Sequence, residues 1–441
     1  ARRSIESHPL SSGQRLKSGN TDDRCDSRIK RIHAWPLFVC EILKMIFLMK
    51  YIICFLFMAF SCTNTPSTKG TFGFDLEFLQ KSEPGILVLE DSSGDAKIII
   101  SPNLQGRVMT STAEGDHGTS FGWLNYDLLA TRKTTKHMTA FGGEERFWLG
   151  PEGGQFSTYF KKGQDFTFEN WQVPAEIDSE AFQLISATKS EAKFTKEMHV
   201  ENYIGTALDL RVDRDVRLLA KENIDQLLGI NLSKEVKMVG FETANSITNT
   251  GKISWNKTNG MLSIWILSML NASEKTMVVA PFKQDAEGPV YTDDYFGKVP
   301  ADRLRHENGV IFFKADAKYR SKIGISPSRA LPFIGSYDAE KQVLTVAQFD
   351  LPGGNSQYVN GKWELQKDPL SGDAVNAYND GVNNGNQLGK FYEIESSSPA
   401  AALDPGKTLT HHHRTIHFMG PKQDLNQISL KVFGIPVDQI K

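Results

Sequence analysis

Short apolar runs with turn-forming residues between them recur from residue 84 to residue 420 and leave few folds open to this chain. In Leu208–Asp213, apolar and charged side chains alternate one by one, which is the pattern of a strand with one buried and one exposed face. Ile86–Leu89 and Ile98–Ile100 flank the turn-like segment Asp91–Asp95 and predict a hairpin. The pattern predicts a single, large, antiparallel all-β sandwich.

Three further apolar runs, Gly260–Leu270, Val310–Phe313 and Val343–Phe349, also predict strands. Amphipathic helices are scarce, and the best candidate, Ala220–Leu228, is short enough to be either a helix or a loop between strands. The longest polar, turn-rich segment is Asp368–Gly389. Loops of that length are uncommon in compact domains and usually functional, so we expect it to contribute to a site.

The composition is that of an ordinary globular protein, with 40% hydrophobic and 23% charged residues, which excludes a disordered chain, collagen and a coiled coil. The formal net charge is −2 at pH 7. Binding to a nucleic-acid backbone normally needs clustered Lys and Arg, so we expect no nucleic-acid partner. We also expect a monomer.

Residues 45–62 have the layout of a secretory signal, because Lys50 precedes an apolar run over residues 51–60 and a small residue and Cys62 follow. The run is too short to span a bilayer, which takes about 20 residues. Cys62 resembles the lipid-bearing cysteine of a bacterial lipoprotein and predicts a membrane anchor. A plain cleaved signal ending near the same residue is the alternative.

This signal sets the expected organisation of the chain. Residues 1–44 would be an upstream extension that precedes the true start, 63–83 a polar tether, 84–420 the sandwich domain and 421–441 a C-terminal extension packed on it. All four cysteines lie in the first 62 residues, so the body can hold neither a disulfide framework nor a cysteine metal site. We expect a lipid-anchored protein of the bacterial envelope, on the periplasmic side.

The first dense group of functional residue types is the segment 142–155, which reads Gly-Gly-Glu-Glu-Arg-Phe-Trp-Leu-Gly-Pro-Glu-Gly-Gly-Gln. Trp148, Arg146 and Glu152 offer a flat apolar face, a fork of donors and an acceptor, which is the mixture that a sugar needs. The alternative is a structural glycine-rich corner with Trp148 in the core and Arg146 paired to a buried Glu. Six aromatic residues that follow should mostly belong to the core: Phe156, Tyr159, Phe160, Phe166, Phe168 and Trp171.

Glu393 and Glu395 are two residues apart and would share one face of a strand. Two carboxylates at close range raise the pKa of one of them, which suits a general base. A solvated acidic strand face is the bland alternative.

Three histidines near the C-terminus, His411, His413 and His417, would also share a strand face. One ion cannot bind all three, because His411 and His417 would lie about 20 Å apart at about 3.3 Å per residue. A metal bound by His411, His413 and a distant carboxylate stays open, and a polar strand face is the simpler interpretation, so we assign no metal site. The body contains no nucleophile elbow, phosphate loop or dinucleotide fingerprint, and we expect no cofactor.

Three segments resemble the galactose mutarotase-like superfamily. Residues 98–109 are similar to its opening strand and Gly-Arg turn, and residues 403–418 to its closing Pro-Gly hairpin and final strand. The block at 142–155 is similar to that of a family of bacterial lipoproteins within the superfamily. The resemblance covers about residues 84–420 and implies a β-supersandwich whose concave face binds a carbohydrate.

In aldose 1-epimerases a Glu takes the proton of the anomeric hydroxyl while a His protonates the ring oxygen. By its place before the Pro-Gly hairpin, Glu395 resembles that Glu. The stretch Ala244–Gly251 corresponds to the strand that carries the His, but it contains none, so His137 or His199 would have to supply the proton.

The resemblance therefore implies Glu395 and His137 as the catalytic pair. We expect Arg146, Trp148 and Glu152 to line the site and Asn379 and Asp380 to close it from the long loop. A non-catalytic envelope module that binds a glycan or a protein is the alternative, as is a retained fold whose pocket is filled by side chains.

Overall fold

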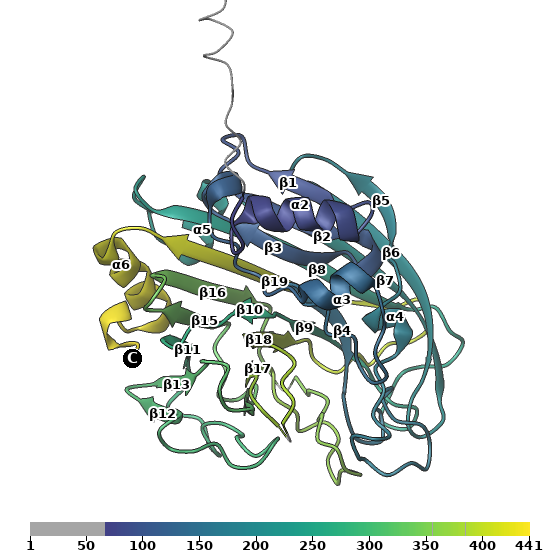
Figure 1. Ribbon diagram of the computed structural model, residues 1–441. Coiled ribbons are helices and arrows are strands. Elements are labelled where there is room, and N and C mark those ends of the chain that lie inside the picture. Colours follow the sequence, from purple (N-terminus) through teal and green to yellow (C-terminus); the bar gives the residue numbers. More distant parts are fainter. Residues whose placement is uncertain (1–66, 355, 384) are drawn as a thin grey trace, which may run out of the picture. The chain divides into compact units, whose positions relative to one another are not determined.

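The computed structural model describes residues 67–441 except Asn355 and Asn384. The predicted upstream extension, the signal segment and Cys62 lie outside the described residues. Every strand pairing in the described part of the chain is antiparallel, and the strands form three sheets (Figure 1).

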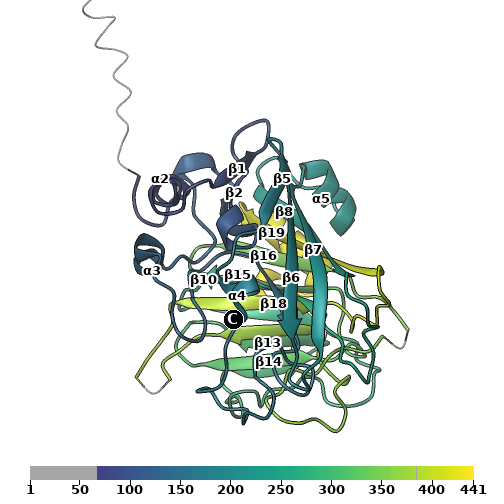
Figure 2. The same ribbon diagram turned by 90° about the vertical axis from the view of Figure 1, so that its right-hand side faces the viewer.

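The largest sheet has ten strands in the order β12-β13-β11-β15-β16-β19-β8-β7-β6-β5. Figure 2 shows its long strands β6 and β7 side by side. The strands span, in chain order, Gln183–Ala187 (β5), Glu191–Glu201 (β6), Ala207–Leu218 (β7), Lys237–Asn249 (β8), Thr276–Pro281 (β11), Leu304–Glu307 (β12), Val310–Lys314 (β13), Phe333–Asp338 (β15), Val343–Phe349 (β16) and Thr408–Met419 (β19).

The second sheet has six strands, in the order β14-β17-β18-β9-β4 with β10 paired to β18, and the third has three, β1-β2-β3. Their bounds are Arg146–Gly150 (β4), Ser263–Leu267 (β9), Leu270–Asn271 (β10), Ser321–Ile325 (β14), Val375–Asn379 (β17) and Phe391–Ser397 (β18), then Leu87–Glu90 (β1), Lys97–Ser101 (β2) and Arg107–Thr112 (β3).

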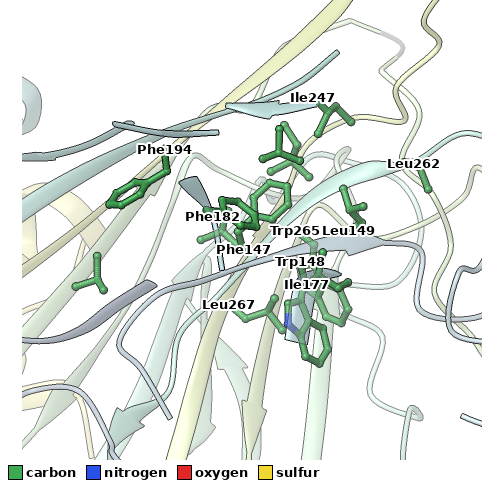
Figure 3. Packing of buried hydrophobic residues seen from close by; sticks show 14 of the residues in the cluster. Phe147, Trp148, Leu149, Ile177, Phe182, Phe194, Ile247, Leu262, Trp265 and Leu267 are labelled. Carbon is green, nitrogen blue, oxygen red and sulfur yellow. The ribbon is translucent and has the colours of Figure 1, made fainter. Parts of the chain in front are cut away.

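One face of the six-stranded sheet packs against the ten-stranded sheet and forms the core of the sandwich. Phe147 and Leu149 of the six-stranded sheet join Phe194 and Ile247 of the ten-stranded sheet in a continuous buried cluster (Figure 3). A second cluster joins β14, β17 and β18 to β11, β13 and β16 in the same way. The predicted fold class, a large antiparallel all-β sandwich, is confirmed.

The sequence pattern located several of these strands. The predicted hairpin is β1 paired to β2, with Leu89 opposite Ile98, and Val343–Phe349 is β16. The long segment Asp368–Gly389 is not one loop, because Val375–Asn379 forms β17 at its centre.

The described helices lie outside the two large sheets. They are Phe72–Ser82 (α2), Tyr126–Thr131 (α3), Ala175–Asp178 (α4), Lys221–Leu228 (α5) and Lys422–Phe433 (α6), with short 3₁₀ turns at Pro102–Leu104, Gly115–His117 and Val437–Gln439. The candidate helix at 220–228 is thus α5. The C-terminal extension contains α6, whose Leu425, Ile428 and Val432 join a buried cluster with Leu344 and Ile416 of the ten-stranded sheet.

The expected tether over residues 63–83 is wrong from residue 71 onward. The Thr71 side chain caps α2 by accepting a hydrogen bond from the Phe74 N–H. Phe72 and Leu79 are buried against β2 and β3, so the folded unit begins before residue 84. Among the described residues, no helix is both long enough and apolar enough to cross a membrane.

Candidate functional site

A cavity of about 760 Å³ lies beside β14, β17 and the loops that lead into and out of the six-stranded sheet. Segments 151–174, 282–303, 350–374 and 380–390 each contribute to its wall. The wall carries aromatic and charged side chains together: Phe168, Tyr295, Phe296, Trp363 and Tyr378 with Glu152, Asp294, Arg320, Lys322, Lys362 and Asp380. Its volume is in the range of small-molecule sites.

The alternation of strand residues explains why polar groups gather on this side of the sheet. Along β18, Tyr392 and Ile394 point into the sandwich core, whereas Glu393 and Glu395 point to the opposite face. The neighbouring strands bring three partners to that face: Arg146 from β4, Trp265 from β9 and Lys322 from β14.

These side chains form two buried ion pairs behind the cavity. Arg146 donates a hydrogen bond to Oε1 of Glu393. Oε2 of Glu395 accepts hydrogen bonds of 2.9 Å from Nε1 of Trp265 and 2.9 Å from Nζ of Lys322. The other carboxylate oxygen of Glu395 is buried and has no partner among the described residues. Lys322 therefore stands between Glu395 and the cavity.

Glu152 and Lys322 are two of the polar groups that line the cavity. Burial raises the pKa of the Glu152 carboxyl, and the nearby Glu395 raises it further. Burial lowers the pKa of the Lys322 ammonium, but Glu395 and Glu152 outweigh burial and raise it above its usual value. Lys322 is thus held in its charged form, as a donor that faces the cavity.

The Tyr295 hydroxyl, on the wall of the same cavity, donates a hydrogen bond of 2.6 Å to Oδ2 of Asp373. Burial raises the pKa of Asp373 to about 6. Position 324 must be glycine for this pair to form, because a Cβ atom there would overlap the Asp373 carboxylate. Gly324 of β14 therefore allows the loop that carries Tyr295 to lie against the sheet.

Asp380 and Asn379 follow each other at the end of β17 but have different surroundings. Asp380 lines the cavity, and its carboxylate accepts hydrogen bonds from the Tyr378 hydroxyl (2.7 Å) and the Gly389 N–H (2.9 Å). Burial raises its pKa. Asn379 points away and is fully buried, with its amide bonded to the backbone at Ala317 and Tyr319. Asn379 holds the strand to its neighbour and does not close the cavity.

Two aromatic side chains on the wall are exposed to solvent, Phe168 at 52% and Phe296 at 41%. Phe168 is the outermost ring of a stack that continues through Trp171 (centroids 6.0 Å apart) to Trp363 (5.8 Å). The Arg320 guanidinium lies over the Phe296 ring, 3.9 Å from its centroid. The cavity therefore presents flat apolar surfaces beside charged groups.

The structure brings only part of the predicted site into the cavity, namely Glu152 and Asp380. Arg146 and Trp148 are each 3% exposed and pack on each other, with the guanidinium 5.0 Å from the indole centroid. Trp148 belongs to the buried core, as Figure 3 shows. The prediction that Arg146 and Trp148 line the site is therefore wrong, and Glu395 lies buried behind Lys322. Their positions match the alternative interpretation, in which Trp148 lies in the core and Arg146 pairs with a buried Glu.

The two histidines considered as acids do not reach the cavity itself. Nδ1 of His137 is 2.6 Å from the Trp171 carbonyl oxygen, and its ring packs against Phe168, so it supports that exposed ring from behind. His199 is exposed on β6, where it pairs with Asp209. Neither histidine lines the cavity.

Three of the four histidines of β19 are buried, namely His411, His413 and His417, whereas His412 is half-exposed and pairs with Asp350. Ser396 Oγ lies 2.8 Å from Nε2 of His411 and 2.8 Å from Nδ1 of His413. Nε2 of His417 is 2.8 Å from the Glu144 carboxylate. No group of three His, Cys, Asp or Glu side chains with the geometry of a metal site occurs among the described residues.

Sequence reasoning missed Lys322, Arg320, Tyr295, Phe296 and Trp363, and it assigned Phe168 to the core. Nothing in the local sequence marks the first five, because they come from separate strands and loops that meet only in the fold. Phe168 lies in the turn-rich segment 151–174, and this neighbourhood could have indicated a surface position. Phe156, Tyr159, Phe160 and Trp171 are buried as expected.

A family model described as a family of unknown function, DUF6786, matches residues 70–441. No curated protein matches the sequence. Among solved structures, the chain is similar to a galactose mutarotase-like protein from Lactobacillus casei, at 9% identity and a TM-score of 0.44, covering 76% of this chain and 100% of that one. It is also similar to a galactose mutarotase related enzyme from Lactobacillus acidophilus, at 10% identity and a TM-score of 0.40, covering 76% and 97%. The narrower resemblance to bacterial lipoproteins stays a prediction.

Proposed function

We propose that this chain, which belongs to the family of unknown function DUF6786, binds a carbohydrate in its cavity of about 760 Å³. The single observation that carries the proposal is the pair of exposed rings, Phe168 and Phe296, on the wall of a cavity that also holds charged donors and acceptors. Exposed apolar surface that is gathered in one place and rimmed by polar groups is typical of ligand-binding grooves.

A sugar ring matches this wall on both counts. Its C–H face covers an aromatic ring, and its hydroxyl groups each donate and accept hydrogen bonds. Lys322 supplies a charged donor on the wall and Glu152 an acceptor beside it. The mixture of ring and carboxylate that the sequence predicted for Trp148 and Glu152 is thus supplied by Phe168 or Phe296 with Glu152.

A thermal-shift screen of the purified protein against neutral and charged mono- and oligosaccharides tests the proposal, because a ligand that binds only the folded state raises the unfolding midpoint. We expect a saturable shift with one class of sugar, and its loss in Phe168→Ala. The matched control is Ile185→Ala, which removes another exposed apolar side chain from the distant edge strand β5. A broad panel with no shift on folded protein would refute carbohydrate binding.

Acid–base chemistry at the anomeric centre is a second candidate function. It is favoured by the position of Glu152 beside Lys322 in the cavity, where burial raises the pKa of the carboxyl group, because enzymes use carboxyl groups with a raised pKa as general acids and bases. Polarimetry of the bound sugar is the test. Turnover that falls in Glu152→Gln while affinity is kept would support an isomerase. Binding without turnover in the wild type would support the alternative, a non-catalytic glycan-binding module.

The proposed location is the bacterial envelope, with a lipid anchor at Cys62, and the support for it is the layout of residues 45–62 alone. Metabolic labelling with a fatty-acid analogue provides the test. We expect label on the wild type and none on Cys62→Ser. If the wild-type protein carries no fatty-acid label and is found in the soluble fraction, the result would favour the alternative of a plain cleaved signal.

A further inference from the structure

We infer that the carbohydrate of this cavity carries an oxyanion, a uronate carboxylate, a sulfate or a phosphate, which Arg320 binds. The inference rests on the proposed function, because it concerns the class of sugar that enters the same cavity. Arg320 is the residue on which it depends, and no sequence motif singled it out.

The three cations on the cavity wall differ in how they are paired. Lys322 bonds to Glu395 at 2.9 Å, and Lys362 lies 3.2 Å from Asp294. Arg320 makes neither an ion pair nor a side-chain hydrogen bond with any residue in the described part of the chain, and it is only partly exposed. Its donors are therefore available to a ligand.

The position of Arg320 is fixed without using those donors. Its guanidinium rests on the ring of Phe296, 3.9 Å from the centroid. This contact uses none of the guanidinium N–H groups as hydrogen-bond donors, and those groups form the fork that binds two oxygens of one oxyanion. Because the side chain is already ordered, less conformational entropy is lost when a ligand binds.

The carboxylates near Arg320 do not take the place of such a ligand. Asp380 is nearest in the chain, and it already accepts hydrogen bonds from the Tyr378 hydroxyl and the Gly389 N–H. Burial raises the pKa of both Asp380 and Glu152, and neither carboxylate forms an ion pair with Arg320. Glu169 and Glu364 lie exposed at the mouth, where water and salt screen them.

Matched pairs of sugars test the inference with the purified protein. Each pair differs only in the anion: trigalacturonate against its methyl ester, glucose 6-phosphate against glucose, and glucose 6-sulfate against glucose. We expect calorimetric titration to show at least one anion bound about tenfold to a hundredfold more tightly than its neutral partner, which is the range of a charge-assisted hydrogen bond. The pair that discriminates identifies the oxyanion.

Two variants assign the effect to Arg320. In Arg320→Gln the preference for the anion should disappear, with affinity for the neutral partner kept within about twofold. The control, Lys298→Gln, removes a cation from the same loop as Phe296, where Lys298 pairs with Asp293 outside the cavity, and the preference should persist.

Each contrary outcome overturns a different statement. Neutral sugars that bind as well as all three anions, or amino sugars that bind better, would contradict the role of Arg320 and leave the carbohydrate site standing. If the Arg320→Gln variant still prefers the anionic sugar, that result would also contradict the role of Arg320 and leave the carbohydrate site standing. No binding by any member of the pairs or by the wider panel would refute the carbohydrate site itself.

Discussion

The two faces of strand β18 carry polar residues one position apart in sequence but in different surroundings. On the face toward the cavity, Glu393 and Glu395 form buried ion pairs with Arg146 and Lys322. On the face toward the core, Ser396 joins two neutral imidazoles between the sheets. The cavity face is built from charges that border an open space, and the core face from hydrogen bonds that are closed off by a second sheet.

This difference indicates which face serves function. Buried ion pairs add little net stability compared with apolar packing, because both charges lose their hydration. Their concentration beside a cavity is therefore better explained by a ligand than by folding. The hydrogen-bonded histidines need no ligand, since their partners all belong to the fold.

The largest expected effect comes from breaking one ion pair on the cavity face. Lys322→Met removes the cation and leaves Glu395 buried without its partner, which should lower the free energy of unfolding by about 3–5 kcal/mol. Urea unfolding measures the change. The double variant with Glu395→Gln should recover most of the loss, because the uncompensated charge is then absent too. A single variant as stable as the wild type would show that the pair is solvated.

Lowering the pH should destabilise the protein through the buried histidines on the core face. Burial lowers the pKa of His411 to about 4 and lowers that of His413 as well. The unfolded state therefore binds more protons than the folded state below about pH 6.5, and stability falls as pH drops from about 6.5 to about 4. His411 alone accounts for on the order of 3 kcal/mol across that window.

The test compares the pH dependence of urea unfolding in the wild type and in His411→Gln. The comparison is needed because Asp373, with its pKa raised to about 6, contributes an opposite slope between about pH 6 and its usual value near 3.8. The variant should lose less stability on acidification. Parallel curves for the two proteins would mean that His411 is protonated in the folded state.

A smaller effect is expected from Ser396→Ala, which deletes the hydroxyl shared by the two imidazoles. The loss should be about 1–3 kcal/mol, the cost of leaving buried polar groups without a partner. Carbohydrate affinity should stay unchanged, since Ser396 faces the core. A variant that loses binding while remaining folded would show that the two faces are coupled.

The smallest effect on stability should come from Arg320→Gln. Arg320 has no ion-pair partner among the described residues, so its loss should change the free energy of unfolding by no more than about 0.5 kcal/mol. Lys322 and Arg320 thus form a matched contrast of a paired and an unpaired cation in one cavity. A loss as large as that of Lys322→Met would reveal a structural role for Arg320.

The strand patterns that were visible in the sequence account for part of the fold. Alternation located β7, and apolar runs located β16 and the β1–β2 hairpin, because each of these elements buries its own residues. It failed at α2, where Phe72, Leu76 and Leu79 have helical spacing that the surrounding polar residues obscured. The local sequence pattern therefore predicts an element correctly where that element buries its own side chains against a neighbouring element.

The site was less predictable for a physical reason. The alternation of a strand's residues tells us which side chains share one face of the strand. It does not tell us whether that face is covered by a second sheet or borders a cavity. Glu395 and His411 both looked like candidates, and only the packing of the sheets separates them. Arg320 and Phe296 come from different segments and meet through tertiary contact, which no spacing records.

The most direct test of the central claim is a crystal structure of the protein with the carbohydrate that produces the largest thermal shift. We predict a sugar ring on Phe168 or Phe296 with its hydroxyl groups bonded to Glu152 or Lys322. A carbohydrate bound elsewhere, with this cavity empty or filled by side chains, would contradict the assignment of the cavity face as the functional one.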